Sequence, residues 1–188
     1  MGRWQPNARG RLEQAALDLY VERGFAQTTV TEIAGRAGLT ERTFFRHFAD
    51  KREVLFSGSA ELQELLVAAV NGAPEGAAPI DAVAAGLDAI GDLMQERRPY
   101  ARRRQSVITA NTELRERELI KLATLSAATA EALHRRGVAE PAASLAAEAG
   151  IAVFRIAFGR WVGGPDDKEL AQLMRESLAE LKAVAAGA

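Results

Sequence analysis

Residues 29–51 contain the pattern of two short helices joined by a tight turn. Thr29 and Glu32 have the spacing of a capping box, in which each side chain accepts a hydrogen bond from the other residue's backbone N–H. Gly38 supplies the left-handed conformation that ends a helix, and Thr40 is a preferred residue for starting the next one. Because these signals are local and strong, the rest of the chain has to pack around a helix–turn–helix.

The second of these helices, expected from Glu41 to Phe48, has one apolar face and one polar face. Phe44 and Phe48 are four residues apart and therefore lie on the same side of the helix. The remaining surface carries Arg42, Thr43, Arg46 and His47. A helix with an apolar back and a cationic, hydroxyl-bearing front suits the major groove of DNA, which is wide enough to admit an α-helix.

The rest of the sequence also favours helices. Apolar residues make up 48% of the 188 residues, which is enough to form a core, and the abundance of Ala favours helix over strand. No stretch alternates apolar and polar residues with the two-residue period of a strand. We therefore expect an all-α protein of about nine helices.

We expect two domains: a three-helix domain with the helix–turn–helix at 1–51, and a larger helical domain at 52–188. Asp50 is expected to cap a fourth helix that continues to about Val70. Near the end of the chain, Asp166 is expected to cap the last helix.

Composition argues against several classes of protein. The sequence has no cysteine, so disulfides and thiolate chemistry are absent, and His47 and His134 are too far apart to suggest a metal cluster. We find no nucleophile beside a base and no phosphate-binding loop, so we expect neither an enzyme nor a cofactor. No leader segment and no uncharged apolar run of about 18 residues is visible, and we expect a cytoplasmic protein.

The net charge of the chain is −1, so overall charge does not indicate a nucleic-acid partner. Up to Phe56 the sequence carries nine Lys and Arg against seven Asp and Glu. DNA binding therefore depends on where these cations point rather than on their number.

The first 55 residues resemble the TetR family of transcriptional regulators. The matching residues are Gly24-Phe25, Thr28-Thr29-Val30, Ile33-Ala34, Ala37-Gly38-Leu39-Thr40, Thr43-Phe44-Phe45, His47-Phe48 and Lys51. The resemblance implies a DNA-binding regulator, by family default a repressor, that binds a palindromic operator as a homodimer and is released by a small molecule.

The resemblance also implies which residues contact DNA. Phosphates would be held by Thr29, Thr43, His47 and Lys51, and base edges would be met by Thr31, Arg42 and Arg46. An arginine that binds guanine through two hydrogen bonds contributes about 1–3 kcal/mol of discrimination. Phe45 replaces the tyrosine that is commoner in the family, so its ring would meet a thymine methyl group or a sugar instead of a phosphate.

The last two helices are expected to form the dimer interface. The helix at 141–162 is apolar almost all round, so one side would face its own core and another side a second subunit. The expected interface residues are Phe154, Phe158, Trp161, Leu170, Leu173, Leu178 and Leu181. A two-fold dimer would place two recognition helices about 34 Å apart, in successive major grooves.

The larger domain is expected to enclose a pocket for the small molecule. Candidate lining residues are Leu66, Ile90, Met94, Arg104, Ile108, Leu122, Ser126, Phe154 and Phe158, although plain core is the commoner role of such side chains. Three segments carry a second resemblance: TFFRHF at 43–48, LRERELIKLATL at 114–125, and HRRGVAEPAASLAAEAGIAVFRIAFGRWV at 134–162. They are similar to a TetR subgroup that includes the mycofactocin-system regulator and is associated with acyl-CoA-like ligands. The dense arginines at 97–104 are expected to form a solvated face, or a site for an anionic ligand group or a DNA phosphate. In this subgroup Arg102 to Arg104 would meet the phosphates of the ligand.

An alternative function is a helical interaction or scaffold dimer that does not bind DNA sequence-specifically. Such a protein needs the dimer seam but not the cationic helix. The sequence does not specify the effector, the operator, or the direction of regulation.

Overall fold

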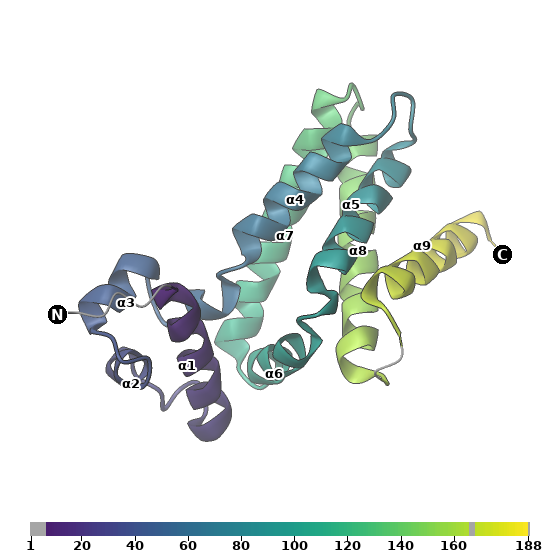
Figure 1. The fold of residues 1–188 in the computed structure, drawn as a ribbon. Coiled ribbons are helices and arrows are strands. Elements are labelled where there is room, and N and C mark those ends of the chain that lie inside the picture. The colour runs from purple at the N-terminus through teal and green to yellow at the C-terminus, as the bar shows by residue number, and fades with distance from the viewer. Residues whose placement is uncertain (1–6, 166–167, 188) are drawn as a thin grey trace. The chain divides into compact units, whose positions relative to one another are not determined.

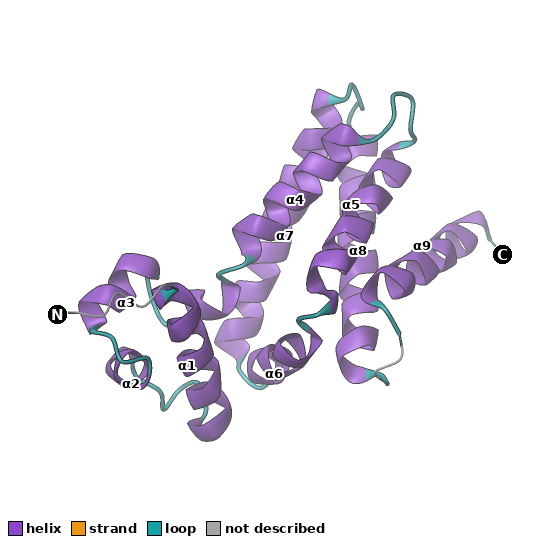
Figure 2. Ribbon diagram, in the orientation of Figure 1, coloured by secondary structure: helices purple, strands orange, loops and turns teal. Residues whose placement is uncertain are grey.

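The computed structural model describes residues 7–165 and 168–187. Within these ranges the chain forms nine α-helices and one short 3-10 helix, and no strand (Figures 1 and 2). This confirms the all-α prediction.

The first three helices are α1 (Ala8–Arg23), α2 (Val30–Arg36) and α3 (Glu41–His47). Each packs against the other two, and their shared core contains Leu12, Ala16, Ile33 and Phe44, all at most 2% exposed. Fully burying a side chain the size of Leu or Phe stabilises the fold by about 1.5–3 kcal/mol.

The caps expected from the sequence set the ends of α2 and α3. Glu32 N donates to Thr29 Oγ1 over 3.2 Å, and Thr29 N donates to Glu32 Oε2 over 2.9 Å, which completes the capping box. Gly38 has a φ of 64°, in the left-handed region, and Thr43 N donates to Thr40 Oγ1 over 3.2 Å. The turn between α2, which ends at Arg36, and α3, which begins at Glu41, is therefore only four residues long.

The rest of the chain forms η1 (Glu53–Phe56), a 3-10 helix, and six α-helices. These are α4 (Ser59–Gly72), α5 (Pro79–Gln95), α6 (Arg98–Thr109), α7 (Thr112–Arg135), α8 (Ala142–Gly163) and α9 (Leu170–Ala186).

Two expected helix starts differ from the structure. The helix expected to continue from Asp50 is divided into η1 and α4, with Gly58 between them; glycine is a poor helix former because it loses the most backbone entropy. The N-cap of η1 is Arg52 rather than Asp50, although Asp50 Oδ1 accepts from Arg52 N over 2.8 Å and from Glu53 N over 3.2 Å. The cap expected at Asp166 lies outside the described residues, and α9 begins at Leu170, whose N–H donates to Gln95 Oε1 over 3.0 Å.

The chain divides into two compact units. The N-terminal unit comprises Met1–Gly58 with Arg103–Glu118, and the C-terminal unit comprises Ser59–Arg102 with Leu119–Ala188. The division falls within α6 and α7, so both helices contribute residues to both units. The domain boundary expected between residues 51 and 52 stays a prediction.

The core of the C-terminal unit is formed by helices that pack in pairs: α4 with α5, α5 with α8 and α9, and α8 with α9. Its largest buried side chain is that of Trp161, which is 0% exposed. Gly150 brings α8 close to α5, since a Cβ atom there would lie 2.3 Å from Val83 Cγ1.

Among the described residues, α8 is the helix that is long and apolar enough to cross a membrane. Ten of its residues are buried within this chain, including Phe154 and Trp161. Packing against α5 and α9 accounts for the apolar residues on the buried side of α8, because a core helix and a membrane span have similar sequences.

Candidate nucleic-acid interface

The helix α3 has the two faces that its sequence predicts. Phe44 and Phe48 are 0% and 4% exposed, and their rings lie 5.5 Å apart between centroids. Arg42 and Arg46 lie on the exposed side, and Phe45, between them in sequence, is 55% exposed. The aromatic back anchors the helix and leaves its cationic side facing solvent.

Most other cations of the N-terminal unit are bound to carboxylates. Arg36 donates two hydrogen bonds to the Glu22 carboxylate, at 3.1 and 2.8 Å. Arg23 bridges to Glu32 at 2.9 Å. Further ion pairs join Arg9 to Glu13, Arg52 to Asp50 and Glu113, Arg103 to Asp18, and Arg117 to Glu53.

These ion pairs shift the pKa values of the carboxylates. Hydrogen bonds from Arg36 hold the pKa of Glu22 below its usual value. For Glu32, the hydrogen bond from the Thr29 backbone N–H is the main cause of a lowered pKa. Hydrogen bonds from the Arg52 side chain lower the pKa of Asp50. The three carboxylates are therefore ionised at neutral pH and neutralise the cations beside them.

Two further cations of this unit are bound by backbone carbonyls. Arg11 donates to Ala37 O at the end of α2. Lys51 Nζ lies 2.9 Å from Phe25 O and 2.8 Å from Thr28 O. This binding of Lys51 by the loop between α1 and α2 has no signal in the sequence; the family resemblance implied a phosphate contact for the same lysine.

Arg42 and Arg46 differ from these cations. Neither makes a hydrogen bond or an ion pair with any residue in the described parts of the chain. Because an arginine carries five N–H donors and keeps its charge at any physiological pH, both side chains are available to an external acceptor. The polar side of α3 is therefore the part of this unit where positive charge is not already used.

The other predicted DNA contacts lie on α2 and α3. Thr29 and Thr31 are exposed, and the Thr31 hydroxyl donates to the Glu41 carboxylate. Thr43 is half-buried, with its hydroxyl 3.1 Å from that of Thr40. The Nε2 atom of His47 is buried and has no partner within the described ranges.

The arginines near the start of α6 were expected to form a solvated face or a phosphate site; Arg97 and Arg102 are exposed and Arg98 is buried, and the guanidinium groups of Arg98 and Arg102 hydrogen-bond within the protein. Arg98 donates to the carbonyls of Trp161, Gly164 and Pro165, and Arg102 donates to those of Val162 and Gly164. In the N-terminal unit, Arg104 donates to Leu55 O over 2.6 Å and to Glu118 over 3.3 Å.

Seven of the nine candidate ligand residues meet in the C-terminal unit. Leu66, Ile90, Phe154 and Phe158 are buried in its core, and Met94 and Leu122 pack against it half-buried. Ser126, 4% exposed, donates to Glu148 over 2.7 Å. Arg104 and Ile108 belong to the N-terminal unit, so the structure does not bring them into this group.

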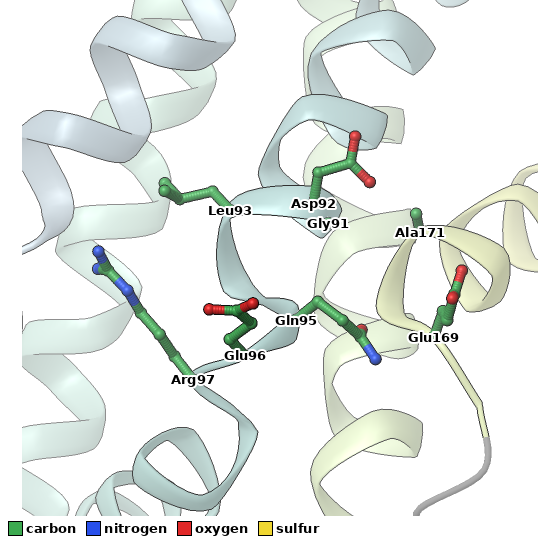
Figure 3. A pocket seen from close by; sticks show the side chains of 8 residues that line it. All are labelled: Gly91, Asp92, Leu93, Gln95, Glu96, Arg97, Glu169 and Ala171. Atoms are coloured by element: carbon green, nitrogen blue, oxygen red, sulfur yellow. The ribbon is translucent and has the colours of Figure 1, made fainter.

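Two surface hollows lie in the C-terminal unit. The first, about 500 Å³, is lined by Gly91, Asp92, Leu93, Gln95, Glu96, Arg97, Glu169 and Ala171 (Figure 3). The second, about 420 Å³, is lined by Arg160, Gly163, Gly164, Pro165, Lys168 and Leu173. Neither contains a predicted ligand residue, and the three carboxylates around the first would repel an anionic ligand.

The residues predicted for the dimer interface are mostly buried in this chain. Trp161 and Leu170 are 0% exposed, and Phe154 and Phe158 are each 9% exposed. Leu173 and Leu178 are also buried, and Leu181 packs half-buried against the same core. On the exposed side of α8 lie Leu145 and Ile156.

Two profiles of protein families match the sequence. The profile described as bacterial regulatory proteins of the tetR family matches residues 13–57, which contain α2 and α3. The profile described as the MftR C-terminal domain matches residues 77–186, more than half of the chain. The chain belongs to the TetR family. This confirms the family expected from the first 55 residues, and the second match agrees with the expected subgroup.

A curated relative of this TetR-family chain is the HTH-type transcriptional regulator TcmR of Streptomyces glaucescens. It is 37% identical over 82 residues, which are 44% of this chain and 36% of TcmR. The chain therefore matches little more than a third of the length of that relative.

Solved structures of similar fold include SmeT in complex with triclosan, with a TM-score of 0.67, 19% identity, and coverage of 95% of this chain and 90% of SmeT. SmeT is the repressor of a multidrug efflux pump of Stenotrophomonas maltophilia. FadR of Bacillus subtilis with stearoyl-CoA has a TM-score of 0.61 at 21% identity, covering 92% of this chain and 96% of FadR. At these identities the matches establish the fold alone.

Proposed function

We propose that this TetR-family protein is a transcriptional repressor that binds a palindromic operator as a homodimer and is released by a small molecule, of which an acyl-CoA is the candidate class. The observation that carries the proposal is the pair of exposed arginines on α3, Arg42 and Arg46, which have no partner among the described residues. In a unit whose other cations are so widely paired, the two unpaired ones lie on one face of one helix.

The dimensions of α3 suit a groove. Its seven residues span about 10 Å at 1.5 Å per residue, and the major groove is about 12 Å wide. Arg42, in the first turn, would bind a guanine through two hydrogen bonds. Arg46, one turn later, would meet a second base or a phosphate, and Phe45 would contact a thymine methyl group or a sugar.

The surroundings of α3 would hold the DNA backbone. The first amides of α2 and α3 have no partner within their helices, and helix N-termini attract anions such as phosphate. The hydroxyl groups of Thr29 and Thr43, with His47, would add hydrogen bonds to phosphates at the same surface. These contacts would position α3 without reading sequence.

A single recognition helix contacts too few base pairs to specify an operator, so we propose a two-fold dimer. The second copy would pack on the side of α8 that stays exposed, supported from behind by Phe154 and Phe158. On that side Leu145 and Ile156 are 66% and 56% exposed, and no atom lies within 4 Å of the Cβ position at Gly159. Leu145 and Ile156 are eleven residues apart, about three helical turns, and Gly159 follows three residues later, so the three positions lie on one side of α8.

The effector is proposed to enter the core of the C-terminal unit, where seven of the candidate residues lie together. Fatty-acyl chains suit this lining, and two FadR structures of similar fold, from Thermus thermophilus and Bacillus subtilis, are complexes with lauroyl-CoA and stearoyl-CoA. Because the core side chains fill this space, the effector would bind a more open state and shift the population away from the DNA-binding state. Its headgroup would need a site other than Arg98 and Arg104, whose guanidinium groups bind the protein itself. We place this regulator in the cytoplasm and assign it no enzymatic reaction.

The test is operator binding by fluorescence anisotropy, with DNA from upstream of the protein's own gene. Replacing both Arg42 and Arg46 by Ala should abolish sequence-specific binding, since each arginine supplies about 1–3 kcal/mol of base discrimination. Arg135→Ala, which removes an exposed cation of α7, is the control and should bind like the wild type. A wild-type protein that binds no upstream DNA would favour the scaffold alternative, and a sedimentation mass of one chain would contradict the dimer.

A further inference from the structure

Lys51 lies two residues before η1, and its half-buried side chain contacts the loop between α1 and α2. The Nζ atom is 2.9 Å from Phe25 O, 2.8 Å from Thr28 O and 3.4 Å from Ala26 O. A lysine ammonium group has three N–H donors. Three carbonyl oxygens of one loop therefore match the donors of this one side chain.

Two aromatic residues complete the surroundings of Lys51. Its Nζ atom lies 4.4 Å from the centroid of the Phe25 ring, a cation–π contact, and that ring is 4% exposed. The Tyr20 ring packs edge-on against Phe25 at 5.2 Å, and the Tyr20 hydroxyl donates to Lys51 O over 2.6 Å. Both the side chain and the backbone of Lys51 are thus bonded to the last turn of α1 or the loop after it.

The loop that Lys51 holds leads directly into the start of α2. Thr28 O, one of its acceptors, belongs to the residue before Thr29, the N-cap of α2. The direction in which α2 begins determines where its unpaired N-terminal amides point. Because Lys51 holds three carbonyl groups of the loop before α2, it also fixes the direction of the amides at the N-terminus of α2.

We propose that Lys51 is a positioning residue of the DNA-reading unit and does not itself contact a phosphate. It holds the loop at 25–28 so that the N-terminus of α2 is aimed at the DNA backbone. This role rests on the proposed function, because the aim of α2 matters only if its amides meet an operator. It differs from the phosphate contact that the family resemblance implies for the same residue.

The two roles predict different dependence of operator binding on salt. Each phosphate that a lysine neutralises releases counterions and adds about 0.9 to the slope of log affinity against log salt concentration. Losing a phosphate contact therefore lowers the slope, and losing a positioning residue leaves the slope unchanged while affinity falls by one factor at all salt concentrations.

The experiment compares Lys51→Met with wild type by thermal unfolding and by operator affinity at several salt concentrations, at a temperature where both are folded. We expect a melting temperature about 3–12 °C lower, from the loss of a charge-assisted hydrogen-bond cluster, and weaker binding with the wild-type slope. A slope smaller by about 0.9 per subunit with an unchanged melting temperature would overturn the proposal. Unchanged affinity with a lower melting temperature would also overturn it, leaving a brace that does not affect DNA binding.

Lys51→Arg is the second variant, and it can distinguish the two roles of Lys51 even if Lys51→Met does not fold. A planar guanidinium cannot direct its donors at the same three oxygens, but it binds phosphate well. A positioning role predicts weaker operator binding with the wild-type slope, whereas a phosphate contact predicts wild-type affinity and slope. If the wild type binds no DNA, the proposed function fails, while the melting temperatures still test whether Lys51 holds the loop.

Discussion

The arginines of α3 and those near the start of α6 are similar in sequence and opposite in their surroundings. Arg42 and Arg46 have no partner in the described residues, whereas Arg98 and Arg102 are bound to carbonyl groups at the end of α8. The denser cluster in the sequence is thus the one whose charge is used inside the protein. Density of cations is a poor guide to a nucleic-acid or ligand site, and availability of their donors is a better one.

The difference has a physical cause. The last four carbonyl groups of a helix have no partner within the helix and carry partial negative charge, so they attract any arginine within reach. The end of α8 offers such carbonyls to Arg98 and Arg102. The exposed side of α3 offers none to Arg42, so an arginine there keeps its donors for another molecule.

The largest effect on stability is expected from Arg98→Ala. Arg98 is 7% exposed and donates to the carbonyls of Trp161, Gly164 and Pro165. Gly164 O also accepts from Arg102, so removal of Arg98 takes the donor from the other two carbonyls, of which Trp161 O is buried. We expect the free energy of unfolding to fall by about 3 kcal/mol, measured by urea denaturation. The control is Arg42→Ala, which should leave stability unchanged. Equal stability of the two variants would remove the distinction between the two groups of arginines.

A smaller effect is expected from Arg103→Ala, on the same helix as Arg98. Arg103 pairs with Asp18 at 2.6 Å, and the two side chains are 41% and 31% exposed. Solvent-exposed ion pairs contribute about 0.2–1 kcal/mol, so the loss in unfolding free energy should lie in that range. A loss as large as that of Arg98→Ala would mean that burial does not determine the contribution of these arginines.

The smallest expected effect is the contribution of Glu22 to the pH dependence of the stability of the fold. Its hydrogen bonds with Arg36 hold its pKa below the usual value, so the folded state favours the ionised form. The resulting stability is present above the unfolded pKa and is lost as pH falls through the folded pKa. Titration followed by NMR should show a lowered pKa of Glu22 in the wild type and a normal value in Arg36→Ala. A normal value in both would mean that the pair is absent in solution.

The parts of the fold that the sequence predicted correctly depend on neighbours within a few residues. Thr29 and Glu32, three residues apart, form the capping box, and Gly38 has the left-handed conformation that ends α2. The two faces of α3 follow from the four-residue spacing of Phe44 and Phe48. In contrast, the division of the expected fourth helix into η1 and α4 was not predicted, since helix signals on both sides of Gly58 favour continuation.

The candidate site, like the fold, was predictable only where it depends on residues close together in the sequence. The exposed positions of Arg42 and Arg46 follow from helical periodicity, but the binding of Lys51 by Phe25 O and Thr28 O joins residues more than 20 positions apart. The predicted ligand and dimer residues were chosen as apolar positions. Periodicity identifies such positions as buried but does not say whether a ligand, a second subunit or the chain itself covers them.

The amino-acid sequence alone determined where the reading helix begins and ends and which of its sides is cationic, because caps and periodicity act over one or two turns. Only the tertiary structure decided which cations remain available. Arg98 meets Trp161 O across 63 positions of sequence, and Lys51 meets its loop across the length of α2 and α3. Such pairings arise when helices pack, and packing is a property of the whole chain rather than of any segment.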